Sequence, residues 1–216
     1  MTATARDEIL ARIRTALSDV PPDETPDDVP VPREYQASHA TGDLADLFAE
    51  RVADYRAIVI RTDTAALPDQ IAAALARRGA HRVIVPEGFP TDWLPPGDWL
   101  RDEPPLPVAE LDRAQAVITT AAVGIAVTGT IVLDAGPGQG RRALSLIPDY
   151  HLCVIRAEQI APDVPAALAS LAAPTDSTVR PLTFISGPSA TSDIEMTRIR
   201  GVHGPRRLTV ILCGAS

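Results

Sequence analysis

The sequence predicts an α/β fold in which a mixed, mainly parallel sheet is flanked by helices. Three observations lead to this prediction. Short apolar runs rich in β-branched residues alternate with segments whose apolar residues have helical spacing. From Gly42 onward these segments follow one another in the βαβ order that is typical of parallel sheets. The chain has 216 residues, of which 45% are hydrophobic, so it can bury the core of one large domain.

The N-terminal segment, residues 1–40, differs in composition from the rest of the chain. Residues 5–17 place Ile9, Ile13 and Leu17 on one face, as in an amphipathic helix. The next stretch holds five prolines among acidic residues, which predicts an extended linker. We therefore expect a helix and linker at 1–40 and an α/β domain at 41–216. The helix could dock on its own domain, on a sister subunit in a homo-oligomer, or on another protein.

The elements expected within the domain follow in chain order. Helical spacing is found at 44–52 and 67–75, and Gly79 closes the second helix as a left-handed cap. A third helix is expected at 165–171. Residues 86–107 hold seven prolines and two tryptophans, which predicts a packed covering loop. The predicted strands lie at 57–60, 83–85, 116–119, 130–133, 152–155, 182–185 and 208–212, and the short connections within 116–133 favour antiparallel pairs there.

Composition excludes several classes of partner. The formal charge is −8 and no basic stripe is present, which argues against nucleic acid as a partner. No apolar run approaches the roughly 20 residues that span a bilayer, and the charged N-terminus does not fit a signal peptide, so we expect a soluble cytoplasmic protein.

The two cysteines, Cys153 and Cys213, lie in the apolar runs 151–155 and 208–213, which have the composition of strands, and are expected to be reduced core thiols. Without a CxxC pair, the chain is expected to hold no iron–sulfur cluster or metal site. The sequence also lacks GxSxG, HExxH, a Walker loop and a GxGxxG after a strand.

The first candidate site is the turn Ser186-Gly187-Pro188-Ser189, which joins a predicted strand to a predicted helix start at 189–195. Unpaired backbone N–H groups at a helix start, with the Ser189 and Thr191 hydroxyls, would bind a phosphate or carboxylate. The alternative is that Ser189 or Thr191 only caps the helix.

The second candidate is the turn Gly201-Val202-His203-Gly204-Pro205, followed by Arg206 and Arg207. Its histidine titrates near neutrality, its glycines allow close approach of a ligand, and Arg206 adds positive charge. A plain tight turn is the alternative. If both turns meet at one sheet edge, they would face a pocket for a small anion. The candidate acid–base groups there are His203, Glu195 and Asp193.

Three weaker candidates lie upstream. Thr128-Gly129-Thr130 enters a strand, where glycine indicates close packing or approach to a ligand. The loop from Gly136 to Arg142 could present arginines to an anion or could be an ordinary hairpin loop. His151 begins a strand and is a further candidate for the site.

Taken together, four motifs resemble the lactate-utilisation protein C family, also called the LUD domain. They are Gly124-Ile-Ala…Thr128-Gly-Thr130, Ser145-Leu-Ile-Pro148…His151, Ile185-Ser-Gly-Pro-Ser189…Thr191…Asp193-Ile-Glu195 and Gly201-Val-His-Gly-Pro205. The resemblance implies the NagB/RpiA/CoA-transferase-like fold of sugar-phosphate isomerases and CoA transferases. It also implies a role in oxidising L-lactate to pyruvate beside iron–sulfur partner subunits encoded nearby.

One position departs from the family pattern. Val127 stands where the family commonly has glutamate before Thr-Gly-Thr, which leaves Asp193 and Glu195 as the motif carboxylates. We therefore expect an accessory subunit of an L-lactate oxidation system that carries no iron–sulfur cluster itself. The alternative is an independent enzyme that acts on a phosphorylated, carboxylated or CoA-ester small molecule.

Overall fold

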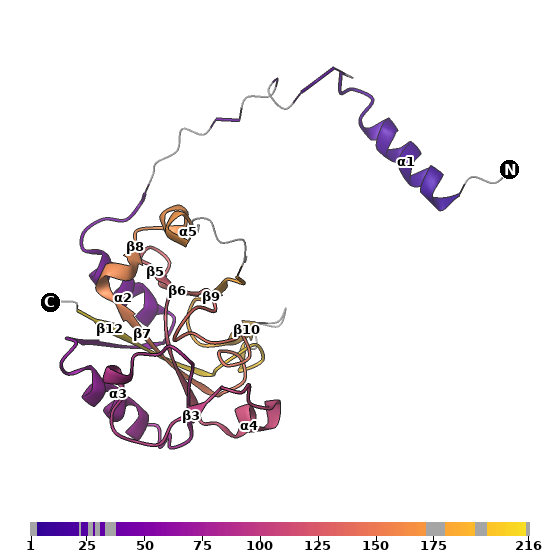
Figure 1. The fold of residues 1–216 in the computed structure, drawn as a ribbon. Helices are drawn as coiled ribbons and strands as arrows, with labels where there is room; N and C mark the ends of the chain where they lie inside the picture. Colours follow the sequence, from indigo (N-terminus) through magenta and orange to yellow (C-terminus); the bar gives the residue numbers. More distant parts are fainter. Residues whose placement is uncertain are drawn as a thin grey trace. The chain divides into compact units, whose positions relative to one another are not determined.

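Two units make up the chain in the computed structural model (Figure 1). They are Met1–Gln36 and Ala37–Ser216, and each is described by itself. The structure describes residues 4–21, 23–25, 28, 31–32, 38–171, 180–192 and 198–214.

Helix α1, Ala5–Ala16, occupies the segment of the first unit for which the sequence predicts a helix. It begins at a capping box, in which the Thr4 hydroxyl accepts from the Asp7 N–H and the Asp7 carboxylate accepts from the Thr4 N–H. None of its residues is buried, and the apolar side chains of Ile9, Ile13 and Leu17 are exposed. That this apolar face docks on another surface stays a prediction.

The main sheet of the second unit has six strands in the order β1-β12-β7-β4-β2-β3, and all neighbouring pairs are parallel. The strands are β1 Ile58–Thr62, β2 Val83–Val85, β3 Leu100–Arg101, β4 Ala116–Thr120, β7 Tyr150–Arg156 and β12 Arg207–Cys213. Residues 150–155 of the central strand β7 are all buried. Burial on both faces explains the continuous apolar runs, and the predicted α/β class is confirmed.

Helices cover both faces of this sheet (Figure 1). On one face, α3 (Leu67–Ala76) packs over a cluster that includes Tyr150 and Leu152. On the other, α2 (Leu44–Asp54) packs over a cluster that includes Cys153 and Ile155. Because side chains alternate along a strand, His151 points to the same side of the sheet as Cys153.

A second, four-stranded sheet has the order β8-β5-β6-β9. Its strands are β5 Val123–Ile125, β6 Thr130–Leu133, β8 Ile160–Ala161 and β9 Thr183–Ile185, and α5 (Val164–Leu171) contacts β5 and β8. β6 pairs antiparallel with both β5 and β9, whereas β5 and β8 are parallel. The expected antiparallel pairs are thus present, but they form a sheet of their own.

The proline-rich segment 86–107 packs on the domain, as predicted. Trp93, Leu94 and Trp99 are partly buried against the cluster under α3, and Phe89 meets Trp93 edge to face with ring centroids 6.0 Å apart. The segment also contains the short strand β3 and a 3-10 turn, Thr91–Trp93, and helix α4 (Val108–Arg113) follows it. These three elements were not predicted.

The predicted helix start after Ser189 is wrong over 189–192. Residues Ala190–Ser192 form strand β10, which pairs antiparallel with β11, Arg198–Arg200. The backbone finds its partners across the hairpin and in the following turn, because the Ser189 N–H donates to the Pro205 carbonyl at 2.8 Å and the Gly201 N–H donates to the Ser189 carbonyl at 3.2 Å. Ser189 therefore neither caps a helix nor belongs to an anion-binding helix start.

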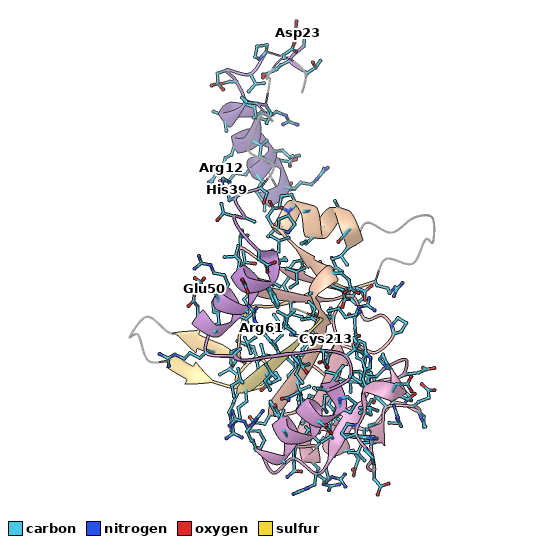
Figure 2. All side chains as sticks on the ribbon, turned by 90° about the vertical axis from the view of Figure 1, so that its left-hand side faces the viewer. Arg12, Asp23, His39, Glu50, Arg61 and Cys213 are labelled. Carbon is cyan, nitrogen blue, oxygen red and sulfur yellow. The ribbon has the colours of Figure 1, made fainter. Side chains whose placement is uncertain are left out.

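Cys153 and Cys213 are free and buried, as predicted, and Figure 2 shows Cys213 inside the α/β domain. Burial raises the pKa of the Cys153 thiol to about 12, so this thiol is not ionised at neutral pH. Within the described part of the chain, no helix has both the length and the apolar character needed to cross a membrane.

Candidate functional site

The two glycine-containing turns line one pocket of about 220 Å³. The pocket lies at the amino ends of β7 and β12, since its walls include His151 and Leu208, the second residue of each strand. Its other lining residues come from the two turns, strand β9, the first residue of β10 and the loop before β7: Arg142, Ser145, Phe184, Ile185, Ser186, Gly187, Pro188, Ser189, Ala190, His203, Gly204 and Pro205.

Ser189 joins the two turns. Its hydroxyl accepts a hydrogen bond from the backbone N–H of His203 at 3.0 Å, in addition to the two backbone bonds that link Ser189 to Gly201 and Pro205. A serine hydroxyl can donate a hydrogen bond as well as accept one, so this contact does not use the hydroxyl proton. Ser189 therefore holds the two turns of the pocket together and places a hydroxyl group in its wall.

Gly187 is fixed by close packing. It has φ +84°, and a Cβ atom there would lie 2.5 Å from the Cβ of Tyr55, the residue that follows α2. A side chain at position 187 would therefore push the first turn away from α2. Close packing against Tyr55 therefore requires glycine at position 187, independently of any contact with a ligand.

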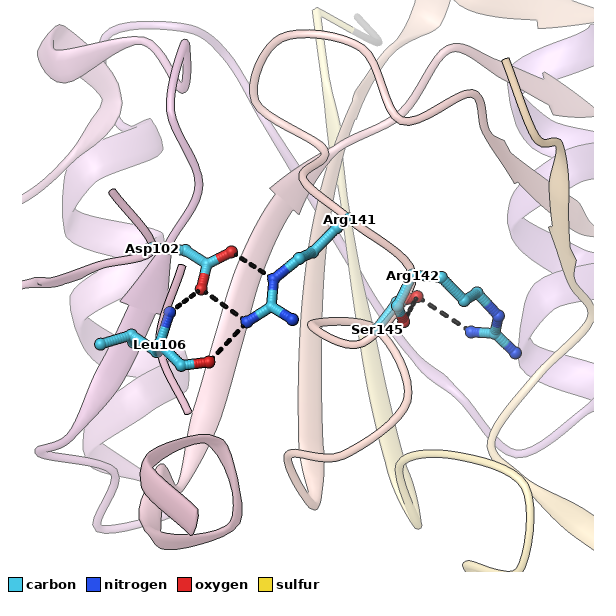
Figure 3. Close-up of polar contacts among 5 residues, drawn as sticks. All are labelled: Asp102, Leu106, Arg141, Arg142 and Ser145. Atoms are coloured by element: carbon cyan, nitrogen blue, oxygen red, sulfur yellow. Dashed lines mark hydrogen bonds and ion pairs between the residues drawn. The ribbon is translucent and has the colours of Figure 1, made fainter. Parts of the chain in front are cut away.

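Arg142 supplies positive charge to the pocket wall. Its Nη1 donates to the Ser145 hydroxyl at 3.0 Å, and that hydroxyl donates to the Arg142 carbonyl at 3.2 Å (Figure 3). The sequence alone does not place this arginine beside the two turns, because only the path of the loop before β7 brings it there.

His151 forms a buried part of the wall, with 1% of its surface exposed. Its Nε2 lies 2.7 Å from the hydroxyl of Thr119 on β4. Burial, with a smaller effect from the Arg142 charge, lowers the pKa of His151 to about 4. The imidazole is therefore neutral at pH 7 and can both accept and donate a hydrogen bond.

The Thr128-Gly129-Thr130 motif reaches the pocket only indirectly. The Thr130 hydroxyl lies 2.7 Å from the Thr128 hydroxyl and 2.8 Å from that of Ser186, which does line the pocket. Gly129 packs on the backbone of α2. Val127, where the resemblance implies a glutamate in relatives, packs against a small apolar cluster of β5, β6 and α5.

The other predicted site residues are distributed as follows. His203 and Gly204 line the pocket, and an acid–base role for His203 stays a prediction. Arg206 lies beside Gly201, outside the lining, with its Nε 3.5 Å from Asp149. The backbone of Thr191 lies in β10. The Thr191 side chain, Asp193 and Glu195 lie outside the part of the chain that is described.

A second cavity, of about 510 Å³, lies at the carboxyl ends of β2 and β3. Its charged lining residues are Glu87, Asp102, Glu103, Arg141 and Arg180. The neighbours Arg141 and Arg142 thus line different pockets, and Figure 3 shows their side chains on opposite sides of the loop that carries them.

The Asp102–Arg141 pair fixes this loop. Arg141 Nε donates to Asp102 Oδ2 at 2.8 Å, and Nη2 donates to Asp102 Oδ1 at 3.0 Å and to the Leu106 carbonyl at 2.7 Å (Figure 3). Burial by itself would raise the pKa of Asp102. The hydrogen bonds from Arg141 and Leu106 and the charge of Arg141 outweigh that effect and lower the pKa.

We expect Asp102→Asn to lower the free energy of unfolding by about 2 kcal/mol, because it leaves a half-buried guanidinium without its charged partner. Urea denaturation at pH 7 measures the loss. A lowered carboxyl pKa stabilises the fold above the ordinary value of 3.8, and this stabilisation is lost as the pH falls further, so the two proteins should converge in acid.

Glu110→Gln is the matched control for this prediction. Glu110 also pairs with arginines, Arg82 at 2.9 Å and Arg113 at 2.7 Å, but all three side chains are more exposed than Asp102. Its loss should stay below about 1 kcal/mol. Equal losses for the two variants would contradict a special role of the Asp102–Arg141 pair.

Comparison with known proteins gives consistent results. The family model described as "LUD domain" matches residues 108–213. A protein of Deinococcus radiodurans named "Lactate utilization protein C" is 50% identical over 214 residues, which cover 99% of this chain and 97% of that protein. A Bacillus subtilis protein of the same name is 24% identical over 192 residues, 81% of this chain and 80% of that protein.

Among solved structures, a crystal structure of a DUF162 family protein from Deinococcus radiodurans is similar to this chain. The TM-score is 0.68 and the sequence identity is 48%. The match covers 79% of this chain and 96% of the other.

Proposed function

The chain belongs to the lactate utilization protein C family, and from this premise we propose that it is an accessory component of a system that oxidises L-lactate to pyruvate. The observation that carries the proposal is the 50% identity, over nearly the whole of both chains, to a protein named for lactate utilization. In this proposal the iron–sulfur clusters belong to partner subunits, and this chain contributes a pocket for a small anion.

The chemistry of the pocket between the two turns supports the second part of the proposal. Arg142 contributes a fixed positive charge, and the Ser189 hydroxyl and the His151 ring contribute polar groups. Charge-assisted hydrogen bonds from a guanidinium are among the stronger contacts that a small anion can make.

The partnership is tested by co-expression of the tagged chain with the iron–sulfur proteins that the proposal expects in the genes beside its own. We expect them to co-elute in a fixed ratio, with the absorbance of iron–sulfur clusters in the fraction. Deleting the gene should abolish growth on L-lactate. A chain that elutes alone, in a strain whose growth on L-lactate does not need it, would overturn the proposal.

The anion pocket is tested separately by calorimetric titration of small anions into the purified chain. We expect Arg142→Gln to weaken binding by about 10-fold or more, since a hydrogen bond to a charged group contributes roughly 1.5–3 kcal/mol. Arg156→Gln is the control, because Arg156 pairs with Glu158 at 3.0 Å outside the pocket lining. Equal affinities of the two variants would place anion binding elsewhere.

A further inference from the structure

We infer that a second anion site lies on the other face of the main sheet, at the carboxyl end of α3, and that it binds the phosphate group of a small phosphorylated molecule. Arg77 and Arg78 form an arginine pair that would hold the phosphate. This site is separate from the pocket between the two turns, so the inference goes beyond the proposed function and does not depend on it.

The site is a cavity of about 290 Å³ at the amino ends of three parallel strands. Its strand residues are Ile58 of β1, Tyr150 of β7 and Thr209 of β12. In the sheet register Ile58 lies beside Thr209, and Arg207, two residues earlier on β12, lies beside Tyr150. Because side chains alternate along a strand, the three lining residues point to one face, the face that α3 covers.

The two anion sites lie on opposite faces of the same two strands. The pocket between the two turns is lined by His151 and Leu208, whereas this cavity is lined by Tyr150 and Thr209, the adjacent residue on each strand. Adjacent residues of a strand point to opposite faces of the sheet. A molecule bound in one pocket therefore does not occupy the other, and the two sites can be tested separately.

The positive charge of the cavity comes from the end of α3. Arg77 is the C-cap residue of the helix and Arg78 follows it, and both line the cavity together with Ala74 from the last turn. The guanidinium carbon of Arg78 lies 5.9 Å from the centre of the Tyr150 ring, which is a cation–π contact. This contact orders the arginine before a ligand arrives and so lowers the entropic cost of binding.

The end of α3 does not need the arginine pair as a cap. The Gly79 N–H donates to the Ala76 carbonyl at 3.0 Å. The Ala80 N–H donates to the Leu75 carbonyl at 3.1 Å, so backbone groups already bind the last carbonyls of the helix. Two positive charges on consecutive residues of one cavity repel each other, and an anion bound between them relieves this repulsion.

Tyr150 and Thr209, the two hydroxyl-bearing residues of the lining, are both buried. The Tyr150 hydroxyl donates to the Thr209 hydroxyl at 2.9 Å. Burial raises the pKa of Tyr150, and the bond to Thr209 and the charges of the arginine pair only partly offset this effect. The phenol is therefore neutral at pH 7 and adds no negative charge that would repel an anion.

Two guanidinium groups match a ligand with two negative charges. A phosphate monoester has a second pKa of about 6, so above pH 7 it carries nearly two charges on three terminal oxygens. Arginine binds such oxygens through paired hydrogen bonds. A carboxylate offers one charge and two oxygens, so it can satisfy only part of the pair.

The size of the cavity fits a phosphate with a short carbon chain. At roughly 30 Å³ per water molecule, about 290 Å³ holds about ten waters, close to the ten non-hydrogen atoms of glycerol 3-phosphate. Ile58 and Ala74 supply apolar surface beside the arginine pair, which suits the carbon chain.

The test is a calorimetric titration of the full-length chain at pH 8 and constant ionic strength with glycerol 3-phosphate, inorganic phosphate and acetate. We expect both phosphates to bind about 10-fold or more tightly than acetate, because they can form charge-assisted hydrogen bonds to both arginines at once. Acetate binding as tight as that of phosphate would overturn the ligand class. No phosphate binding to the wild-type chain would overturn the site itself.

The double variant Arg77→Gln/Arg78→Gln should weaken the binding of inorganic phosphate about 10-fold or more. Arg82→Gln/Arg113→Gln is the matched control, because it removes the same charge from two arginines that pair with Glu110 outside the cavity lining. This control should keep the wild-type affinity. Equal losses in the two double variants would mean that net charge, and not the cavity, attracts phosphate.

A cavity-filling variant tests the same site without changing its charge. Ile58→Trp, at a partly exposed residue, narrows the cavity and should weaken the binding of glycerol 3-phosphate about 10-fold. Urea denaturation checks that each variant is folded. Wild-type affinity in both the folded tryptophan variant and the folded arginine-pair variant would overturn the inference.

Arg142→Gln separates this site from the pocket between the two turns. This variant should bind glycerol 3-phosphate at the arginine pair as the wild-type chain does. If Arg142→Gln loses phosphate binding while the arginine-pair variant keeps it, phosphate binds between the two turns. This inference is then wrong, and the anion pocket of the proposed function stands. The co-elution experiment tests the role in lactate oxidation independently of both results.

Discussion

Gly129→Ala is expected to lower the free energy of unfolding by about 3 kcal/mol or more. A Cβ atom at this position would lie 2.5 Å from the carbonyl carbon of Arg51 and 2.6 Å from the nitrogen of Val52, both in the backbone of α2. Backbone atoms in a helix cannot turn aside as a side chain can, so the second sheet would have to move. The φ of +58° adds a conformational cost of roughly 1–2 kcal/mol. Urea denaturation followed by circular dichroism measures the loss.

Gly79→Ala is the matched control for the steric part of this effect. Gly79 has φ +59°, and an added Cβ would meet nothing within 4 Å. This variant should therefore lose only the conformational part, roughly 1–2 kcal/mol. If both alanine variants lose the same free energy, close packing on α2 is not what requires glycine at 129.

The sequence predicts an element well where burial alone determines it. The runs at Val83–Val85 and Thr130–Leu133 are fully buried, and the predicted bounds match the observed strands. Strands β3 and β8 have two residues each and exist only because a neighbouring strand supplies their hydrogen bonds. No local pattern marks such short strands.

The candidate site was only partly predictable, for a similar reason. Glycine and proline mark both turns in the sequence, and the structure brings the two turns to one pocket. Arg142 and His151 join them only through the path of the loop before β7 and the pairing of β7 with β12, in which His151 lies beside Leu208. The expected helix after Ser189 is replaced by a hairpin, because tertiary partners such as Pro205 take up the backbone donors.

Lowering the pH from 7 to 4 is expected to remove up to about 3 kcal/mol of stability through His151 alone. The ordinary histidine pKa of 6.5 applies in the unfolded chain, whereas burial and the Arg142 charge lower the pKa to about 4 in the folded chain. Between these values the unfolded state binds the proton and the folded state does not, so stability falls as the pH falls. The gap corresponds to about 3 kcal/mol at 1.36 kcal/mol per pH unit.

The His151 contribution is isolated by comparing the wild-type chain with His151→Gln in urea denaturation between pH 7 and pH 4. The variant should be less stable at pH 7, because it disturbs a buried hydrogen bond to Thr119, and its stability should fall less steeply in acid. His81→Gln, at an exposed histidine, should follow the wild-type curve. Parallel curves for wild type and His151→Gln would mean that the buried ring takes up its proton without a cost to folding. In that case the ring would carry a positive charge in the pocket at moderately acidic pH.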